Sequence, residues 1–197
     1  MEEIVFVTHN KGKAISAAKY FKDLKIHTYD YELSEPRSDD IKLSATAKVL
    51  EAYNIVGMPC MALDAGFFIN SLNGFPKAFV NFTLETIGIE GILKLMEEKI
   101  DRTCAFRECL AYYDGADIKY FYGELKGSLS NSIHVDNNGC RWSDLWYIFK
   151  PYGFNKTLSE MSLEELDNRT LIDKSTSAME EFANWYQNKE NIKIKKL

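Results

Sequence analysis

The chain has 197 residues, and its 24 lysines and arginines against 29 aspartates and glutamates give a formal net charge of −5. With 46% hydrophobic residues it has enough apolar material for one core of domain size, which excludes an intrinsically disordered chain. The acidic balance excludes a large nucleic-acid footprint, because basic residues cluster only at Lys193, Lys195 and Lys196.

The N-terminus and the cysteines indicate the compartment. No positively charged region with a long apolar run opens the chain, so we expect no signal peptide. No apolar run approaches the roughly 18 residues of a transmembrane helix. The absence of a C-x-x-C pair argues against a zinc site. Because we expect no secretory signal, we predict free thiols in a cytoplasmic protein, and because we expect no transmembrane helix, we predict no membrane partner. The cysteines are Cys60, Cys104, Cys109 and Cys140.

The first half of the chain alternates strand and helix patterns. Strands are expected at 3–8, 25–31 and 59–69, and helices after residues 10–13, at 42–56 and at 83–98. The spacing of apolar residues assigns the buried faces of the first two helices. These faces are Ile15, Ala18 and Phe21, and then Leu43, Ala47, Leu50, Ala52 and Tyr53.

The second half begins with a run of strands. Strands at 102–113 and 117–124 flank Asp114-Gly115, a pair that tolerates the positive φ of a tight turn. We further expect a strand at 126–135, a turn at 137–139, an aromatic-rich loop with a short strand at 140–157, and a final helix at 174–187. A helix is also expected to begin near Ser159 or Ser162, and the final helix to bury Met179, Phe182 and Tyr186. This order predicts an α/β fold around a mixed sheet.

The segment Thr8–Lys13 is a first candidate site. It lies where a predicted strand leads into a helix, and helix N-terminal amides favour anions. Lys11, Gly12 and Lys13 beside those amides are compatible with a triphosphate cradle. The alternative is an ordinary strand-to-helix turn with surface lysines.

Asp64 and Glu124 are candidate functional carboxylates. Asp64 interrupts an apolar strand, where a carboxylate needs a cation, a donor or a metal, unless it ends the strand and bonds loop amides. Glu124 lies between two glycines, as expected either of a functional carboxylate or of a structural turn.

Aromatic residues and histidines give weaker signals. The aromatic segment 142–154 is compatible with a purine sandwich or with core packing. His9, His27 and His134 are scattered, and no serine–histidine–aspartate set is readable in the sequence.

Four segments have been described: Thr8–Lys13, the stretches around Asp64 and Glu124, and the aromatic segment 142–154. In their order and spacing along the chain they resemble the inosine triphosphate pyrophosphatase family over residues 4–187. The family motif T-x-N-x-x-K-x-x-E is matched by Thr8, Asn10 and Lys13, and A-x-x-K by Ala45 and Lys48. The family's D-D-S-G-L corresponds to residues 63–67, with Asp64 and Gly66 retained. Further matches are Arg102, Ala105, Phe106, Phe121, Gly123, Glu124, Gly127, Phe149, Pro151, Gly153, Thr157, Glu160 and Met161.

The resemblance implies a single domain over 1–197, an elongated mixed sheet in two lobes with flanking helices and a central nucleotide-binding cleft, and a homodimer. It also implies purine nucleoside triphosphates such as dITP, ITP and XTP as ligands, with Mg²⁺ bridging the phosphates. Asp64 would be catalytic, and Asp64 and Glu124 would hold the metal. The nucleotide-binding residues would be Thr8, Asn10, Lys13, Lys48, Gly66, Phe149 and Lys174.

Several family positions are altered. Ser16, Leu63 and Trp146 stand where the family has acids, and the family's S-H-R element is missing, with Arg169 or Lys174 as possible substitutes. A serine, a leucine and a tryptophan cannot serve as anionic metal ligands or as a general base.

These departures favour a nucleotide-binding member that hydrolyses poorly or not at all. Such a chain is similar to nucleotide-sensing subunits of antiphage complexes that act with an NAD-consuming, sirtuin-like effector protein. The alternative is an active pyrophosphatase in which Asp64 is the base or a metal ligand, Glu124 a second ligand, and Lys13 and Lys48 hold the phosphates. An unrelated α/β binding protein is the third hypothesis.

Overall fold

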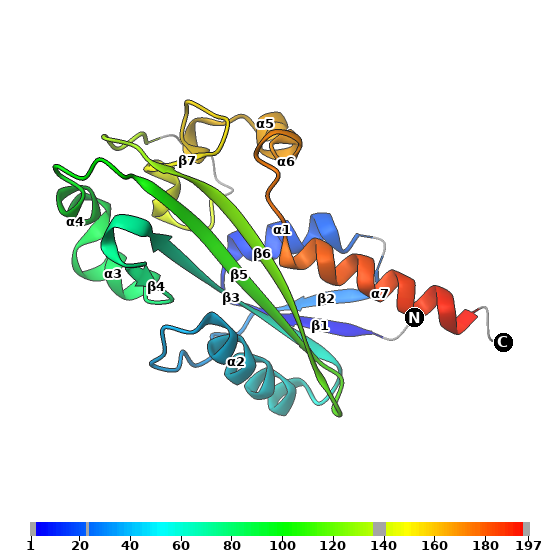
Figure 1. Ribbon diagram of the computed structural model, residues 1–197. Coiled ribbons are helices and arrows are strands. Elements are labelled where there is room, and N and C mark those ends of the chain that lie inside the picture. The colour runs from blue at the N-terminus through cyan, green and yellow to red at the C-terminus, as the bar shows by residue number, and fades with distance from the viewer. Residues whose placement is uncertain (1–2, 23, 136–140, 195–197) are drawn as a thin grey trace. The chain divides into compact units, whose positions relative to one another are not determined.

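Figure 1 shows the computed structural model, which describes residues 3–22, 24–135 and 141–194. The elements in chain order are β1 (Ile4–Val7), α1 (Lys11–Tyr20), β2 (Ile26–Tyr29), α2 (Ile41–Val56), β3 (Cys60–Ile69), η1 (Asn70–Leu72), β4 (Pro76–Lys77), α3 (Val80–Thr86), α4 (Gly88–Leu95), β5 (Thr103–Tyr113), β6 (Ile118–Leu129), η2 (Asp144–Tyr147), β7 (Phe149–Pro151), η3 (Leu158–Glu160), α5 (Leu163–Asn168), α6 (Thr170–Asp173) and α7 (Ala178–Ile194).

The strands form one mixed, seven-stranded sheet in the order β2-β1-β3-β5-β6-β7, with β4 pairing β3 off this path. β1 is parallel to β2 and to β3, whereas β4 is antiparallel to β3 and β7 to β6. The parallel pairs are connected through α1 and α2, since parallel strands need a crossover between them. The predicted α/β class with a mixed sheet and flanking helices is therefore confirmed.

The chain divides into two compact units. Unit 1 comprises Met1–Asp64, Glu108–Gly123 and Ser177–Leu197, and unit 2 comprises Ala65–Arg107 and Glu124–Thr176. The unit boundaries fall inside the long strands β3, β5 and β6, so each of these strands contributes to both units. The two-lobed cleft implied by the family resemblance stays a prediction.

In unit 1 the alternation of side chains along the strands produces two different cores. Small residues of β3 and β5 meet α2, in a cluster that includes Ala45, Val49, Ala52, Cys60, Ala62, Cys109 and Ala111. Large aromatic residues meet α7, where Phe182 contacts Phe21, Tyr112 and Phe121. Figure 1 shows α2 separated from α1 and α7 by the strands, and α1 contacts α7.

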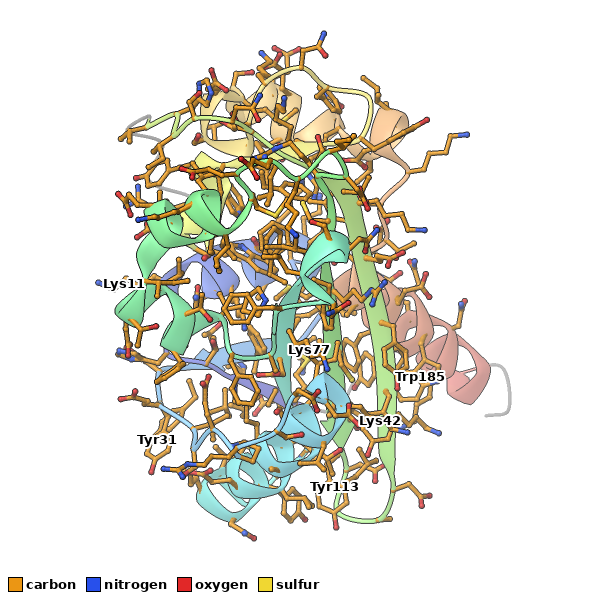
Figure 2. All side chains as sticks on the ribbon, turned by 60° about the vertical axis from the view of Figure 1, so that its left-hand side comes forward. Lys11, Tyr31, Lys42, Lys77, Tyr113 and Trp185 are labelled. Atoms are coloured by element: carbon orange, nitrogen blue, oxygen red, sulfur yellow. The ribbon has the colours of Figure 1, made fainter. Side chains whose placement is uncertain are left out.

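Two aromatic contacts fix α2 against the hairpin of β5 and β6 within unit 1. The ring of Tyr53 lies 4.8 Å from that of Tyr113, and Nζ of Lys42 lies 4.6 Å from the ring centre of Tyr120. Lys42 and Tyr113 are both labelled in Figure 2. At the hairpin turn Gly115 has a φ of 95°, which confirms the predicted Asp114-Gly115 turn.

Unit 2 has its own apolar core. Phe67 and Ile69 of β3 pack with residues of α4, β6, η2, β7 and η3, among which Ile92, Met96, Leu125, Leu145, Phe149, Leu158 and Met161 are buried. Arg102 fastens the edge of this core, because its guanidinium donates to the carbonyls of Met96, Leu129 and Ser130. Unit 2 is thus held together by apolar packing and by the hydrogen bonds of Arg102 at the edge of its core.

The predicted apolar faces of α1 and α2 are wrong in part. Ile15 is 52% exposed, and Leu43 and Leu50 are 51% and 41% exposed. The faces turned inward carry small or polar residues, namely Gly12 and Ala17 in α1 and Ser44, Ala45, Lys48, Val49 and Ala52 in α2. Tertiary packing overrides apolar spacing here, because small side chains allow a helix to approach the sheet closely.

Three predicted elements have different bounds. The helix expected at 83–98 is two helices, α3 and α4, because Gly88 has a φ of 66°. The separate strand expected at 126–135 does not form, since β6 continues to Leu129 and the chain then leaves the sheet. The helix expected from 174 begins at Ala178, because Lys174 ends α6 in a left-handed conformation. The predicted turn at 137–139 lies outside the described residues.

The remaining helix predictions are confirmed. Ser162 and Glu165 form a capping box at α5, and the side chains of Met179, Phe182 and Tyr186 are fully buried on α7. In the part of the chain that the structure describes, no helix combines the length and apolarity needed to cross a membrane.

The described cysteines are free and buried, as predicted. They are Cys60, Cys104 and Cys109, whereas Cys140 lies outside the described residues. Burial raises the pKa of Cys60 to about 12 and that of Cys109 to about 11, so both thiols stay protonated and inert near neutral pH.

Replacing Phe182 by alanine tests the aromatic core of unit 1. We expect Phe182→Ala to lower the free energy of unfolding by about 3–5 kcal/mol, because a fully buried ring leaves a cavity. Phe82→Ala is the control, since Phe82 is 66% exposed and its loss should cost less than about 1 kcal/mol. Urea denaturation measures both, and equal losses would contradict this account of the core.

Candidate functional site

The turn between β1 and α1 is built by two of the predicted site residues. Asn10 is the N-cap of α1, and its Oδ1 accepts the backbone N–H of Lys13 at 2.9 Å. Oγ1 of Thr8 in turn accepts the backbone N–H of Asn10 at 3.2 Å. These bonds hold the first turn of α1 so that the side chain of Lys13 reaches the carbonyl oxygen of Leu63 on β3, at 3.3 Å.

A buried ion pair lies between α2 and β3. Nζ of Lys48 lies 2.6 Å from Oδ1 of Asp64, and both side chains are about nine-tenths buried. Asp64 stands at an even position of β3, as Cys60 and Ala62 do, so strand alternation directs all three toward α2. Lys48 lies one helical turn from Ala45 and Ala52, on the buried face of α2.

This arrangement decides between the two predictions for Asp64. The residue lies within β3 rather than at its end, and its partner is a buried cation rather than loop amides. Asp64 is therefore a buried carboxylate with a cationic partner, and its functional role stays a prediction.

Glu35 is a third member that the sequence analysis missed. Its Oε1 accepts from Nζ of Lys48 at 2.9 Å, although its side chain is 56% exposed. It lies in the loop before α2, next to Pro36. Only the fold reveals it, because a contact between a loop and a helix thirteen residues on has no periodic signature in sequence.

Electrostatics differ between the two lysines of this cluster. Burial lowers the pKa of Lys13, and the nearby charge of Lys48 lowers it further, against weaker opposing effects of Asp64, Glu108 and Glu35. Burial also disfavours the charge of Lys48, but the contacts with Asp64 and Glu35 outweigh it and raise the pKa of Lys48. Lys48 is thus a firmly held cation, whereas Lys13 is a cation without full compensation.

The carboxylates of this cluster fit a magnesium ion only in part. No group of three or more metal-binding side chains occurs within the described ranges 3–22, 24–135 and 141–194. Asp64 and Glu35 nevertheless converge on one ammonium group, so their oxygens lie close to a common point. Mg²⁺ typically takes one or two carboxylates together with substrate phosphates, and this pair fits that role.

Glu124 belongs to unit 2 and is engaged there. Its two oxygens pair with Nε of Arg107 at 2.9 Å and with Nζ of Lys126 at 3.2 Å. Although burial opposes the charge, these two cations lower the pKa of Glu124, so it is a carboxylate near neutral pH. Its backbone also bridges to Thr176. Metal binding by Glu124 stays a prediction.

Gly66 also belongs to unit 2. A Cβ at this position would lie 2.7 Å from the carbonyl oxygen of Lys77, so the glycine permits a close approach of that backbone. The structure accounts for the glycine by this protein contact, and ligand binding at Gly66 stays a prediction.

Phe149 and Lys174 have contrasting surroundings in unit 2. Phe149 is fully buried and its ring contacts Phe67 and Phe106, which supports the core interpretation of this part of the aromatic segment. Lys174 is exposed. Arg169, the other substitute considered for the missing S-H-R element, is bound to Asp173 at 2.8 Å. Nucleotide contacts of Phe149 and Lys174 stay predictions.

The altered family positions have structural surroundings of their own. Leu63 is buried with 5% exposure, and Trp146 packs partly buried against the core of unit 2. Asp144, the acid two residues before Trp146, pairs with Arg141 at 3.2 Å. Unit 1 contains a cluster of two lysines and two carboxylates, namely Lys13, Lys48, Asp64 and Glu35. Its lysines are candidates for binding a phosphate.

Comparison with known proteins identifies similar chains. The profile of the Ham1 family matches residues 4–185. The dITP/XTP pyrophosphatase of Saccharolobus solfataricus is 36% identical over 191 residues, covering 95% of this chain and 97% of that protein. The dITP/XTP pyrophosphatase of Thermococcus kodakarensis is 33% identical over 192 residues, covering 96% and 99%.

Solved structures share the fold. A HAM1 protein from Coxiella burnetii matches with a TM-score of 0.80 at 19% identity, covering 95% of this chain and all of that one. The Ham1 protein of Staphylococcus aureus matches with a TM-score of 0.76 at 21% identity and the same coverage. At these identities the likeness establishes the fold alone.

Removing the cation of the buried pair tests its energetic role. We expect Lys48→Met to lower the free energy of unfolding at neutral pH by about 3–5 kcal/mol, because Asp64 is left buried without its partner. The double variant Lys48→Met/Asp64→Leu should recover most of this loss, as both charges are gone. Urea denaturation of the parent, Lys48→Met, Asp64→Leu and the double variant measures the coupling energy between the two residues. Purely additive losses would contradict the predicted coupling.

Removing Lys13 should have the opposite effect on stability. Because the pKa of Lys13 is lowered in the folded state, its charge destabilises the fold at neutral pH, and Lys13→Met should be more stable than the parent. The folded parent loses this proton as pH rises through the lowered pKa, so the advantage of Lys13→Met should shrink as pH approaches 10.5, the ordinary pKa of a lysine side chain. Denaturation at neutral and alkaline pH measures the difference in the free energy of unfolding between Lys13→Met and the parent. A difference that grows with pH would refute the prediction.

Proposed function

Since the chain belongs to the Ham1 family, we propose that it binds the triphosphate of a deaminated purine nucleotide, such as dITP, ITP or XTP, through Lys13 and Lys48 in unit 1, and that binding rather than turnover is its principal function. The observation that carries the proposal is that buried Lys48 pairs with Asp64, while the partly buried Lys13 reaches the carbonyl oxygen of the adjacent Leu63. Two dITP/XTP pyrophosphatases at 33% and 36% identity support the choice of nucleotide.

The charges of the cluster explain why a triphosphate would be favoured. Lys13 is a partly buried cation whose charge is opposed by that of Lys48, and an anion between the two lysines relieves the repulsion. Charge-assisted hydrogen bonds from ammonium groups to phosphate oxygens are stronger than neutral ones. The N-terminal amides of α1, held by Asn10, add a favourable partial charge.

Magnesium has a place in this proposal only together with nucleotide. When bound, Mg²⁺ would neutralise phosphate charge and polarise the phosphoryl group. Asp64 and Glu35 would hold it, which requires Lys48 to share or exchange these carboxylates with the ion. Lys48 would then turn its ammonium group toward phosphate oxygens.

Altered acids support binding without efficient hydrolysis. Ser16 and Leu63 provide no carboxylate beside Lys13 and Asp64, and Trp146 provides none in unit 2. A sensing subunit needs different affinities for the nucleotide in two states, not chemistry. It would pass its occupancy to another protein, which we propose to be a second copy of the chain or an NAD-consuming effector.

Hydrolysis is the second candidate, and the Glu35–Asp64 pair favours it. Two carboxylates on one ammonium group restore a donor set for Mg²⁺ that the sequence motifs had reduced to Asp64 in this unit. Asp64 would then orient a water whose oxygen attacks the α-phosphorus, with pyrophosphate leaving and the nucleoside monophosphate remaining. The 33–36% identity to named pyrophosphatases supports this candidate equally.

One experiment separates the two candidates and tests the shared site. Isothermal titration of dITP, XTP and dATP measures binding, and parallel incubation with Mg²⁺ measures pyrophosphate. We expect dITP or XTP to bind and remain largely intact. Lys13→Met should weaken binding by roughly 10–100-fold, because it removes a charge-assisted hydrogen bond to phosphate while the protein stays folded.

The matched control is Lys42→Met, which removes an exposed lysine from the same helix as Lys48 and should leave affinity unchanged. Rapid pyrophosphate release that Asp64→Asn abolishes while binding persists would overturn the binding-only proposal and establish the second candidate. Absence of nucleotide binding would refute both.

A further inference from the structure

A serine–histidine–glutamate arrangement occurs among residues of unit 2, whereas the residues of the proposed phosphate site belong to unit 1. Oγ of Ser132 lies 3.0 Å from Nε2 of His134. Nδ1 of the same ring lies 3.1 Å from Oε1 of Glu160. This set cannot be read from the sequence, because Glu160 is 26 residues from His134 and comes close to it only in the folded chain.

The three side chains stand in the relation of nucleophile, base and orienting acid. We propose that Ser132 is a nucleophile that accepts an acyl group from a small carboxylic ester, with His134 as its general base and Glu160 as the positioning residue of that base.

The glutamate is fixed in its charged form. Its Oε2 accepts the backbone N–H and the hydroxyl of Thr157, each at 2.8 Å. These bonds and the adjacent His134 lower the pKa of Glu160 although it is partly exposed. A carboxylate at this place accepts a hydrogen bond from Nδ1–H of the imidazole, which leaves Nε2 as the acceptor that faces Ser132.

The loop that carries serine and histidine is anchored at both ends. The backbone N–H of Ser130 donates to Ile148 at 2.7 Å, and that of His134 donates to Tyr147 at 2.9 Å. The carbonyl of Ser130 also accepts from Arg102 at 2.7 Å. The short segment between these anchors therefore holds Ser132 against the ring without relying on a long, free loop.

Exposure selects Ser132 over its neighbour. Oγ of Ser130 also lies 3.0 Å from Nε2 of His134, but Ser130 is only 4% exposed. Ser132 is exposed and the His134 side chain is 37% exposed, so an ester can reach both. Ser130 thus competes for the imidazole without being accessible to a substrate.

The proposed step is an acyl transfer. Oγ of Ser132 bonds to the carbonyl carbon while its proton passes to Nε2 of His134. The C–O bond of the ester then breaks, and the leaving alcohol takes that proton. Water activated by the same imidazole would later hydrolyse the acyl-serine, releasing the acid and restoring Ser132.

A fluorophosphonate probe tests the nucleophile directly. In its reaction the serine oxygen bonds to phosphorus, fluoride leaves, and the serine proton passes to the imidazole and then to solvent. We expect one label per chain, located at Ser132 by peptide mass spectrometry and absent in Ser132→Ala. Ser162→Ala is the matched control, since Ser162 is an exposed serine that caps α5.

Variants of the base and the acid separate chemistry from structure. His134→Ala should label at least tenfold more slowly, and added imidazole should restore part of the rate. Glu160→Gln should also slow labelling at least tenfold with the fold intact. The glutamine side chain still accepts hydrogen bonds from Thr157, but it no longer fixes the tautomer of His134. Ser130→Ala should label at the parent rate or faster.

The contrary results are equally definite. A label spread over several serines would overturn the proposal, as would labelling of Ser132 at the parent rate in His134→Ala. Hydrolysis of 4-nitrophenyl acetate supplies an ester readout, and a release of nitrophenol unchanged in Ser132→Ala would refute acyl transfer at this residue.

Discussion

The buried contact between Lys48 and Asp64 is the constraint on which the candidate site depends. An ion pair so far removed from water gains little stability compared with apolar packing, yet removing one partner is costly. The pair links α2 to β3. The ammonium group of Lys48 also binds Glu35, so both carboxylates lie next to this group. The arrangement leaves Lys13 as a partly buried cation whose pKa is lowered by desolvation and by the charge of Lys48, and this favours a bound anion.

The same sheet serves two units with different cores. In unit 1 small residues allow α2 to approach the strands closely, while α7 contributes the aromatic side. Unit 2 encloses its core with short helices and with β7, and polar networks close its edges. The hydrogen bonds of Arg102 and of Thr157 with Glu160 show how these loops satisfy their polar groups.

Family membership and site chemistry contribute different parts of the functional argument. The Ham1 match and the pyrophosphatase relatives fix the class of ligand to be tested. The residues of this chain then decide how far the family reaction applies. Ser16 and Leu63 weaken the expectation of hydrolysis, whereas Glu35 strengthens the expectation of metal binding together with nucleotide.

The sequence by itself determined the α/β class, most strand and helix positions, the capping box at Ser162 and the need of a buried Asp64 for a partner, because these depend on local periodicity and on single unusual residues. It did not determine which faces of α1 and α2 are buried, since Ile15 and Leu43 follow apolar spacing and yet face solvent. Only the tertiary structure decided that Glu35 joins Lys48, and that Glu160 meets His134. Such contacts join residues from separate elements, and their energies come from burial and charge, which no short stretch of sequence encodes.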